Sequence, residues 1–252
     1  MFSKRIGIFL LIGMIVLISG CTRSFKTNYK IGDLQLSGVD IPKNISIGIT
    51  KFQDQRPWIE ERNAKSKSFI AQNGVWRFGL SYNSVNYYPL NDFLQDIFVL
   101  EFNEAGLNSR KAGKEVTKND VVILKELATI ENVDCILGGQ ILTFEFANET
   151  GFWTVTSRRN VTLSLTLLKA DGSELFKNLT FSDSSRENQG MVSVHSTNVD
   201  KLFNGLLKNV ISQVLKTLSE KLSVSQKDIN VNIFYAGVLY NYSLVDGTLK
   251  PS

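Results

Sequence analysis

Residues 134–146 read DCILGGQILTFEF, a run in which apolar residues occupy both sets of alternate positions. A half-buried strand alternates apolar and polar residues, whereas a strand covered on both faces is apolar throughout. The run therefore predicts a central strand. Gly138 and Gly139 lie inside it. Because no lysine follows them and no helix opens there, they favour the close approach of a packed helix over a phosphate-binding loop.

The next segment along the chain, residues 160–185, predicts a hairpin. Apolar residues at every second position from Val161 to Leu167 alternate with threonine and serine, which is the period of a strand with one buried face. Asp171 and Gly172 supply a tight turn, after which ELFKNLTF returns as the second strand.

Outward from this centre, residues 44–57 (NISIGITKFQDQRP) predict a first strand, and three apolar stripes of helical period predict helices. The expected helices span 89–106, 117–134 and 198–222. Strands and helices thus follow one another without strict alternation. This order predicts an α+β fold, in which a mixed or antiparallel sheet carries two or three helices packed on one face.

The N-terminus has the pattern of a secretory signal peptide. Lys4 and Arg5 precede an apolar run over 6–18, and Ser19-Gly20 are small. As a helix the run covers only ~20 Å, short of the ~30 Å hydrocarbon core of a bilayer. We therefore expect cleavage rather than a permanent membrane span.

Ile18-Ser19-Gly20-Cys21 resembles the bacterial lipobox, in which the cysteine becomes the first mature residue and carries a diacylglycerol. Several acyl chains give a stable anchor. Thr22, rather than an acidic residue, follows the cysteine, and by resemblance to envelope lipoproteins this favours the periplasmic face of the bacterial outer membrane. Inner-membrane anchoring and surface exposure stay open as alternatives.

Four segments follow from these patterns. They are a signal peptide (1–20), a lipidated tether (21–43), an α+β domain (44–222) with an aromatic-rich insertion (58–88), and a C-terminal extension of one or two strands (223–252).

The insertion contains the residues that we take as a candidate partner or ligand surface: Trp58, Trp76, Phe78, Tyr82, Tyr87 and Tyr88. Aromatic rings supply large contact areas at low entropic cost, and they also serve as ordinary core. The sequence leaves both interpretations open. The tail over 229–247 is a second candidate surface.

Charge and cysteine content narrow the function classes. The formal net charge is +4, and it falls to about +2 once Lys4 and Arg5 leave with the signal peptide. A net charge so close to zero argues against nucleic-acid binding. With Cys21 lipidated, Cys135 has no disulfide partner and is expected to be a buried thiol. Covalent lipid on Cys21 is the only expected cofactor.

Residues suited to catalysis are few. His195 is the only histidine, which excludes multi-histidine metal sites, and no G-x-S-x-G motif accompanies it. Asp54 and Arg56 predict a structural ion pair, and Arg158-Arg159 predict solvated surface. We therefore expect no catalytic residues and no metal site.

Two segments resemble a family. IGITKFQDQRP (47–57) and LKELATIENVDCILGGQILTFEF (124–146) are similar to the YajG-like envelope lipoproteins. More distantly they resemble the curli-secretion lipoprotein fold, the penicillin-binding-protein activator lipoproteins and the auxiliary lipoproteins of ABC transport systems. The resemblance covers about 44–222 and implies an accessory or assembly protein without catalytic residues.

These observations predict a non-enzymatic, lipid-anchored periplasmic protein that serves a bacterial envelope complex. Its partners would be the membrane, through the lipid, and an envelope protein or a second copy of itself. The alternative is a lipid- or glycan-binding periplasmic module whose aromatic residues line a groove.

Overall fold

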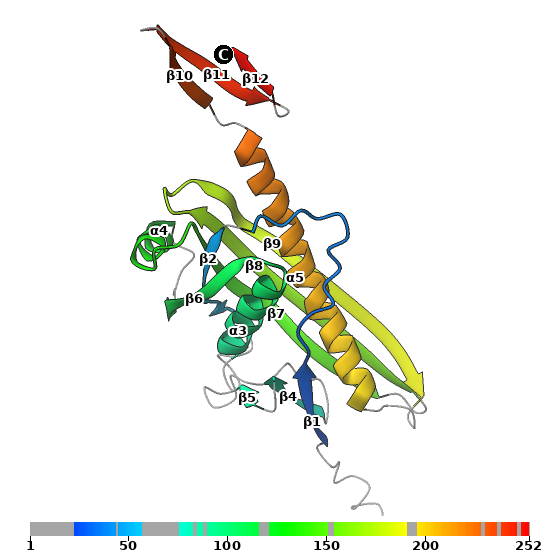
Figure 1. Ribbon diagram of the computed structural model, residues 1–252. Coiled ribbons are helices and arrows are strands. Elements are labelled where there is room, and N and C mark those ends of the chain that lie inside the picture. The colour runs from blue at the N-terminus through cyan, green and yellow to red at the C-terminus, as the bar shows by residue number, and fades with distance from the viewer. Residues whose placement is uncertain are drawn as a thin grey trace, which may run out of the picture.

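The computed structural model describes residues 23–43, 45–56, 76–82, 85–87, 90–115, 121–150, 154–190, 196–227, 230–235, 238–245 and 248–251. Its centre is a six-stranded mixed sheet in the order β6–β2–β7–β8–β9, in which β3 pairs with β7 beyond the end of β2 (Figure 1). The strands are β2 (Ser46–Lys51), β3 (Gln53–Asp54), β6 (Asn108–Glu115), β7 (Cys135–Thr150), β8 (Thr154–Lys169) and β9 (Glu174–Gly190).

The apolar run at 134–146 is the centre of this sheet, as predicted. Strand β7 pairs parallel with β2 and antiparallel with β8, and β8 pairs antiparallel with β9 through the predicted turn. Gly172 has a φ of +91° there, and its N–H donates to the carbonyl of Lys169 at 2.9 Å. Strands β8 and β9 run well beyond the predicted hairpin.

Strand β6 is an element that the sequence did not predict. It pairs parallel with β2 at the edge of the sheet, and its sequence NSRKAGKE has no apolar alternation. Only Ser109 and Ala112 are buried among its described side chains. An edge strand with so little buried surface leaves no hydrophobic pattern to detect.

Three helices accompany the sheet in the part of the chain that the structure describes. They are α3 (Leu90–Glu104), α4 (Val121–Ile130) and α5 (Ser196–Lys227). Helix α3 ends before Gly106, whose φ of +95° fits a helix-terminating glycine. Helix α4 is shorter than the predicted segment, and α5 continues beyond residue 222.

The two faces of the sheet are covered differently. Helices α3 and α5 pack on one face together with Ile47, Leu137 and Leu163, whereas α4 packs on the other against Ile136 and Leu168. Successive residues of a strand point to opposite faces, so the doubly apolar β7 can serve both layers. The α+β fold with two helices on one face is confirmed, and the third helix lies on the opposite side.

Aromatic rings form the centre of the larger core. Phe203 of α5 lies 6.1 Å from Tyr29, 6.1 Å from Phe93 and 6.2 Å from Phe144 between ring centroids. Edge-on and tilted arrangements at such distances are favourable. This cluster joins α3, α5, the sheet and the N-terminal segment into one packed unit.

Much of the segment expected as a lipidated tether (21–43) packs against the body. Tyr29 is buried, and Ile31, Leu34, Leu36 and Ile41 pack against the core. We call residues 28–42 the belt, because they run along α5 in contact with the body. Its apolar residues alternate only in short pairs, such as Leu34 with Leu36 and Val39 with Ile41, so no continuous period predicted this docking.

Two small sheets complete the fold. Strands β1 (Arg23–Tyr29), β4 (Trp76–Tyr82) and β5 (Val85–Tyr87) form one, in which β1 and β4 are parallel. Strands β10 (Asn230–Tyr235), β11 (Val238–Val245) and β12 (Thr248–Pro251) form the other, beyond the C-terminal end of α5 (Figure 1). The C-terminal segment therefore has three strands, one more than the most we expected, and they do not extend the main sheet.

Candidate functional site

The structure pairs part of the predicted aromatic segment with the strand that follows the predicted lipidation site in the sequence. Trp76, Phe78 and Tyr82 lie on β4 and Tyr87 on β5, although their side chains are outside the described residues. Strand β4 pairs along its whole length with β1, which begins two positions after Cys21. Cys21, Trp58 and Tyr88 themselves lie outside the described residues.

The belt continues from β1 and is held by side chains of α5. The amide of Asn204 donates to the Asn28 carbonyl at 2.9 Å and accepts from the Lys30 N–H at 2.7 Å. About two turns apart along the helix, Ser212 accepts from the Gln35 N–H at 3.2 Å, and Ser219 donates to the Asp40 carbonyl. These contacts tie the belt to the helix in a fixed register.

A buried carboxylate fastens the start of the belt to α3. The Tyr29 hydroxyl donates to Glu101 Oε1 at 2.7 Å, and the Gly32 N–H donates to Oε2 of the same residue at 3.1 Å. Glu101 is fully buried, and this burial raises its pKa despite the two donors. Burial and the neighbouring Glu101 also raise the pKa of Tyr29, which keeps the hydroxyl protonated as the donor.

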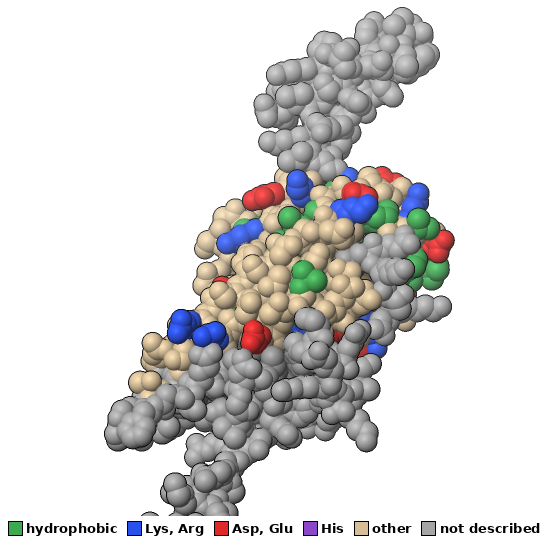
Figure 2. Space-filling view, turned by 180° about the vertical axis from the view of Figure 1, so that it is seen from behind, with side chains coloured by type: hydrophobic (Ala, Val, Ile, Leu, Met, Phe, Trp, Pro, Cys, Tyr) green, Lys and Arg blue, Asp and Glu red, His purple; other side chains and the backbone are tan. Residues whose placement is uncertain are grey.

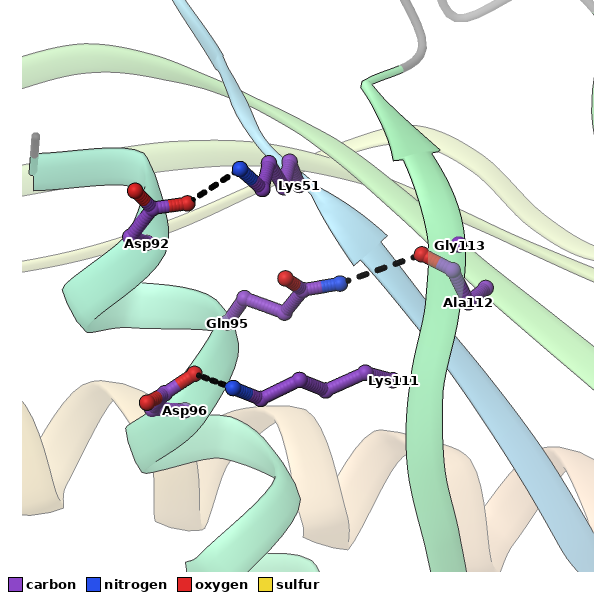
Figure 3. A pocket seen from close by; sticks show the side chains of 7 residues that line it. All are labelled: Lys51, Asp92, Gln95, Asp96, Lys111, Ala112 and Gly113. Carbon is purple, nitrogen blue, oxygen red and sulfur yellow. Dashed lines mark hydrogen bonds and ion pairs between the residues drawn. The ribbon is translucent and has the colours of Figure 1, made fainter.

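A cavity of about 420 Å³ lies between α3 and the edge strand β6 (Figure 3). Two ion pairs cross it, Lys51 to Asp92 at 2.5 Å and Lys111 to Asp96 at 2.5 Å. Between them Gln95 donates to the carbonyls of Ile49 at 2.7 Å and Ala112 at 3.3 Å. Two lysines and two aspartates line it, so its charges are balanced, which suits a small polar ligand rather than an acyl chain.

The sheet face opposite α3 and α5 is largely uncharged and polar (Figure 2). Its surface beyond α4 is mainly made of amide and hydroxyl residues on β3, β7, β8 and β9: Gln53, Gln140, Asn160, Thr162, Thr180 and Ser182. Figure 2 shows charged side chains towards the margins of this face. An antiparallel sheet commonly leaves one such face to water.

The large hydrophobic side chains that are exposed among the described residues lie mostly on α4. Val122, Ile123 and Ile130 of α4 are exposed, whereas the exposed Leu179 of β9 pairs with Leu165 and so belongs to the other face of the sheet. The helix still buries Leu124, Leu127 and Ala128 against the sheet. Its outward residues thus form a small apolar spot beside a polar surface.

The predicted ion pair between Asp54 and Arg56 is confirmed. Arg56 is buried and donates two hydrogen bonds to the Asp54 carboxylate, from Nε at 2.8 Å and from Nη2 at 2.6 Å. Its Nη1 reaches the Phe144 carbonyl at 3.4 Å, which ties the end of β3 to β7. The expectation that Arg159 is solvated surface was wrong, because its exposed fraction is only 3%. This burial lowers the pKa of Arg159.

The predicted buried thiol is confirmed at Cys135. Burial, helped by the charge of Asp134, raises the pKa of Cys135 to about 12. Among the described residues no helix is long and apolar enough to cross a bilayer. The same residues contain no cluster of three or more His, Cys, Asp or Glu residues positioned to hold a metal ion. His195 lies outside them.

Comparisons with known proteins yield similar solved structures and no family. No family model and no curated protein matches the chain. A DUF330 protein from Xanthomonas campestris is 13% identical with a TM-score of 0.49, over 81% of this chain and 98% of that one. A lipoprotein from Neisseria meningitidis is 13% identical with a TM-score of 0.37, over 68% and 97%. The PelC dodecamer from Paraburkholderia phytofirmans is 13% identical with a TM-score of 0.36, over 71% and 93%.

Similarity at this level does not assign the chain to the YajG-like family or to an activity, so that resemblance stays a prediction. The residues missed by sequence reasoning are Glu101, Asn204 and the belt that they hold. Isolated polar residues inside amphipathic helices carry no sign of a distant partner segment, so no local pattern could have revealed them.

Proposed function

We propose that the protein is a lipid-anchored accessory or assembly protein of the bacterial envelope, held through Cys21 at the periplasmic face of the outer membrane. The observation that carries the proposal is the docked belt. Because residues 28–42 are fixed to α3 and α5, only the few residues between Cys21 and Tyr29 separate the anchor from the packed body. In this arrangement the lipid holds the body close to the membrane and sets its orientation.

The surface that meets the envelope partner is, in this proposal, the sheet of β1, β4 and β5. Its strand β4 carries Trp76, Phe78 and Tyr82, and its neighbour β1 leads directly from the anchor. Aromatic residues are enriched in protein interfaces. A partner bound there would lie beside the membrane, as expected for a component of an envelope complex. The protein works by binding, without a catalytic step of its own.

Labelling with radioactive palmitate tests the anchor. Wild-type protein in a bacterial host should incorporate the label and sediment with membranes, and Cys21→Ser should do neither. Equal labelling of the Cys21→Ser chain would overturn the proposal. Fractionation of inner and outer membranes then decides between the two possible locations.

A comparison of partner recovery tests the surface. Detergent-solubilised envelopes should yield a partner with the wild-type chain and several-fold less with Trp76→Ala/Tyr82→Ala. Ile130→Ala is a matched control, because Ile130 is 75% exposed on α4, away from this sheet. Equal recovery with both variants would remove the aromatic strand from the interface.

The cavity between α3 and β6 favours one form of the alternative function, the binding of a polar, glycan-type ligand. Its lysines and aspartates offer donors and acceptors to such a ligand, and the side-chain carbonyl of Gln95 offers a further acceptor. Native mass spectrometry with peptidoglycan fragments tests this. Binding that is lost in Gln95→Leu would support the alternative, and an absence of any bound fragment would reject it.

A further inference from the structure

The register of the C-terminal sheet gives it one apolar face. Residues paired directly across an antiparallel ladder share a face with each other and with every second position along each strand. The ladder pairs Ile233 with Tyr240 and Leu244 with Leu249. The positions that share this face are Val231, Ile233, Tyr235, Val238, Tyr240, Tyr242, Leu244, Leu249 and Pro251. The opposite face mixes these types with asparagine, serine, threonine and Lys250.

In the part of the chain that the structure describes, no helix or other sheet packs extensively on this sheet. Strands β10, β11 and β12 contact one another, and they stand beyond the end of α5, away from the central sheet (Figure 1). Three short strands without a covered face have little stability of their own. An apolar face of this kind is typically an interaction site.

The position of the sheet argues against the anchoring membrane as its occupant. The start of α5 lies beside β1 and the belt, through Asn204, whereas the sheet follows the other end of the helix. The 32 residues of α5 span ~48 Å at ~1.5 Å per residue. The lipid end and the C-terminal sheet are therefore far apart.

The same geometry favours a second copy of the chain. Copies anchored in one membrane would carry their C-terminal sheets at the same height, because each belt is fixed to its α5. The nine face positions carry no charge, so two identical faces meet without repulsion. Complete burial of their side chains would cover roughly 750 Å² per copy, close to the ~800 Å² of a standard interface.

We propose that the sheet of β10, β11 and β12 is a self-association module, in which the apolar face of one copy packs on the same face of a second copy. Two antiparallel sheets stacked face to face about 10 Å apart form a sandwich, and a twofold axis between identical patches closes the assembly as a dimer. The alignment of copies rests on the proposed lipid anchor, whereas the contact itself does not.

The test measures mass in solution for the mature chain with Cys21→Ser, which carries no lipid. Light scattering and sedimentation should give a dimer that dissociates at least tenfold more readily in Tyr240→Asp. Asn241→Asp is the matched control, since it places the same charge on the neighbouring position of β11 and on the opposite face. The Asn241→Asp variant should dimerise as strongly as the chain that has no substitution in this sheet.

Three outcomes would overturn the proposal. In the first, the Cys21→Ser chain stays monomeric up to high micromolar concentration. In the second, Tyr240→Asp and Asn241→Asp weaken the dimer equally. In the third, the chain is a monomer that floats with phosphatidylethanolamine–phosphatidylglycerol vesicles. If Tyr240→Asp lowers the melting temperature, Tyr240→Ser must still weaken the dimer relative to Asn241→Ser. A failure of palmitate labelling would reject the anchor and leave this result intact.

Discussion

The two faces of the central sheet differ in how much they bury. The face under α3 and α5 holds a continuous core that reaches from Tyr29 to Leu222, with four interlocking aromatic rings at its centre. The face under α4 holds a small cluster around Leu124, and the surface beyond it is amide and hydroxyl. Most of the apolar burial, and so most of the stabilising free energy, belongs to the first face.

The difference also shows where the chain can change without unfolding. The belt, the aromatic cluster and the buried Glu101 all belong to the first face, so the connection to the anchor shares the main core. The second face contributes less to stability and leaves polar surface available. The predictions below test this division.

The largest expected effect is on the first face. Phe203→Ala removes the ring that touches Tyr29, Phe93 and Phe144, and should lower the free energy of unfolding by ~3–5 kcal/mol. Leu124→Ala on the second face should cost ~2–3 kcal/mol. Urea denaturation measures both, with exposed Ile130→Ala as a control expected within ~0.5 kcal/mol of wild type. A larger loss for Leu124→Ala would contradict the division.

Alanine substitutions at two adjacent glycines of β7 compare how tightly the two faces are packed at one point in the sheet. A Cβ at Gly139 would lie 2.4 Å from Leu165 Cδ2 and 3.0 Å from Phe52, whereas at Gly138 it would lie 2.8 Å from Leu124 Cδ2. Leu165 and Phe52 are enclosed by the main core, while Leu124 belongs to α4, which has a small buried cluster beneath it and exposed residues on its outer side. Gly139→Ala should therefore destabilise by ~2–3 kcal/mol and Gly138→Ala by ~1 kcal/mol, as measured by urea denaturation. The reverse order would show that α4 is the more rigidly held layer.

Tyr29→Phe tests the fastening of the belt. It leaves the ring in the core and removes one donor from the buried Glu101, so the free energy of unfolding should fall by ~1–2 kcal/mol. Limited proteolysis within residues 28–42 should also become faster. A variant as stable and as resistant as wild type would mean that the ring alone holds the belt.

The pH dependence of the free energy of unfolding tests the protonation of Glu101. Because burial raises the native pKa of Glu101 above its ordinary value of 4.5, the folded state holds this proton more tightly than the unfolded chain. The stability that comes from this tighter proton binding is fully present below the pKa of Glu101 in the unfolded chain. It is lost as the pH rises through the pKa of Glu101 in the folded protein. Glu101→Gln should therefore gain stability relative to wild type over that rise. A constant difference between the two chains across pH 4–8 would contradict a raised pKa.

The smallest effect is expected at Cys135. With its thiol buried and its pKa raised to about 12, the native protein should resist thiol reagents at pH 8, and labelling should begin only with unfolding. A Cys21→Ser chain removes the second cysteine from the measurement. Rapid labelling of the folded chain would show that the core opens locally at β7.

Several elements could be predicted from the sequence because their burial is periodic. The alternation from Val161 to Leu167 and the stripe of α5 are confirmed, as is the central place of the run at 134–146. Strand β6 and the belt could not be predicted, because neither shows a continuous hydrophobic period. The candidate site was predicted only in part: β4 and its aromatic residues were singled out, but not the strand that pairs with them.

The sequence by itself determined the α+β class, the central strand, the hairpin and the expectation of a lipid on Cys21, since each of these depends on local periodicity or on adjacent residues. Only the tertiary structure decided that residues 28–42 are docked, that α4 lies on the opposite face from α3 and α5, and that Glu101 meets Tyr29. Such contacts join residues far apart in the chain. Their stability comes from burial and paired hydrogen bonds that exist only once the layers have closed.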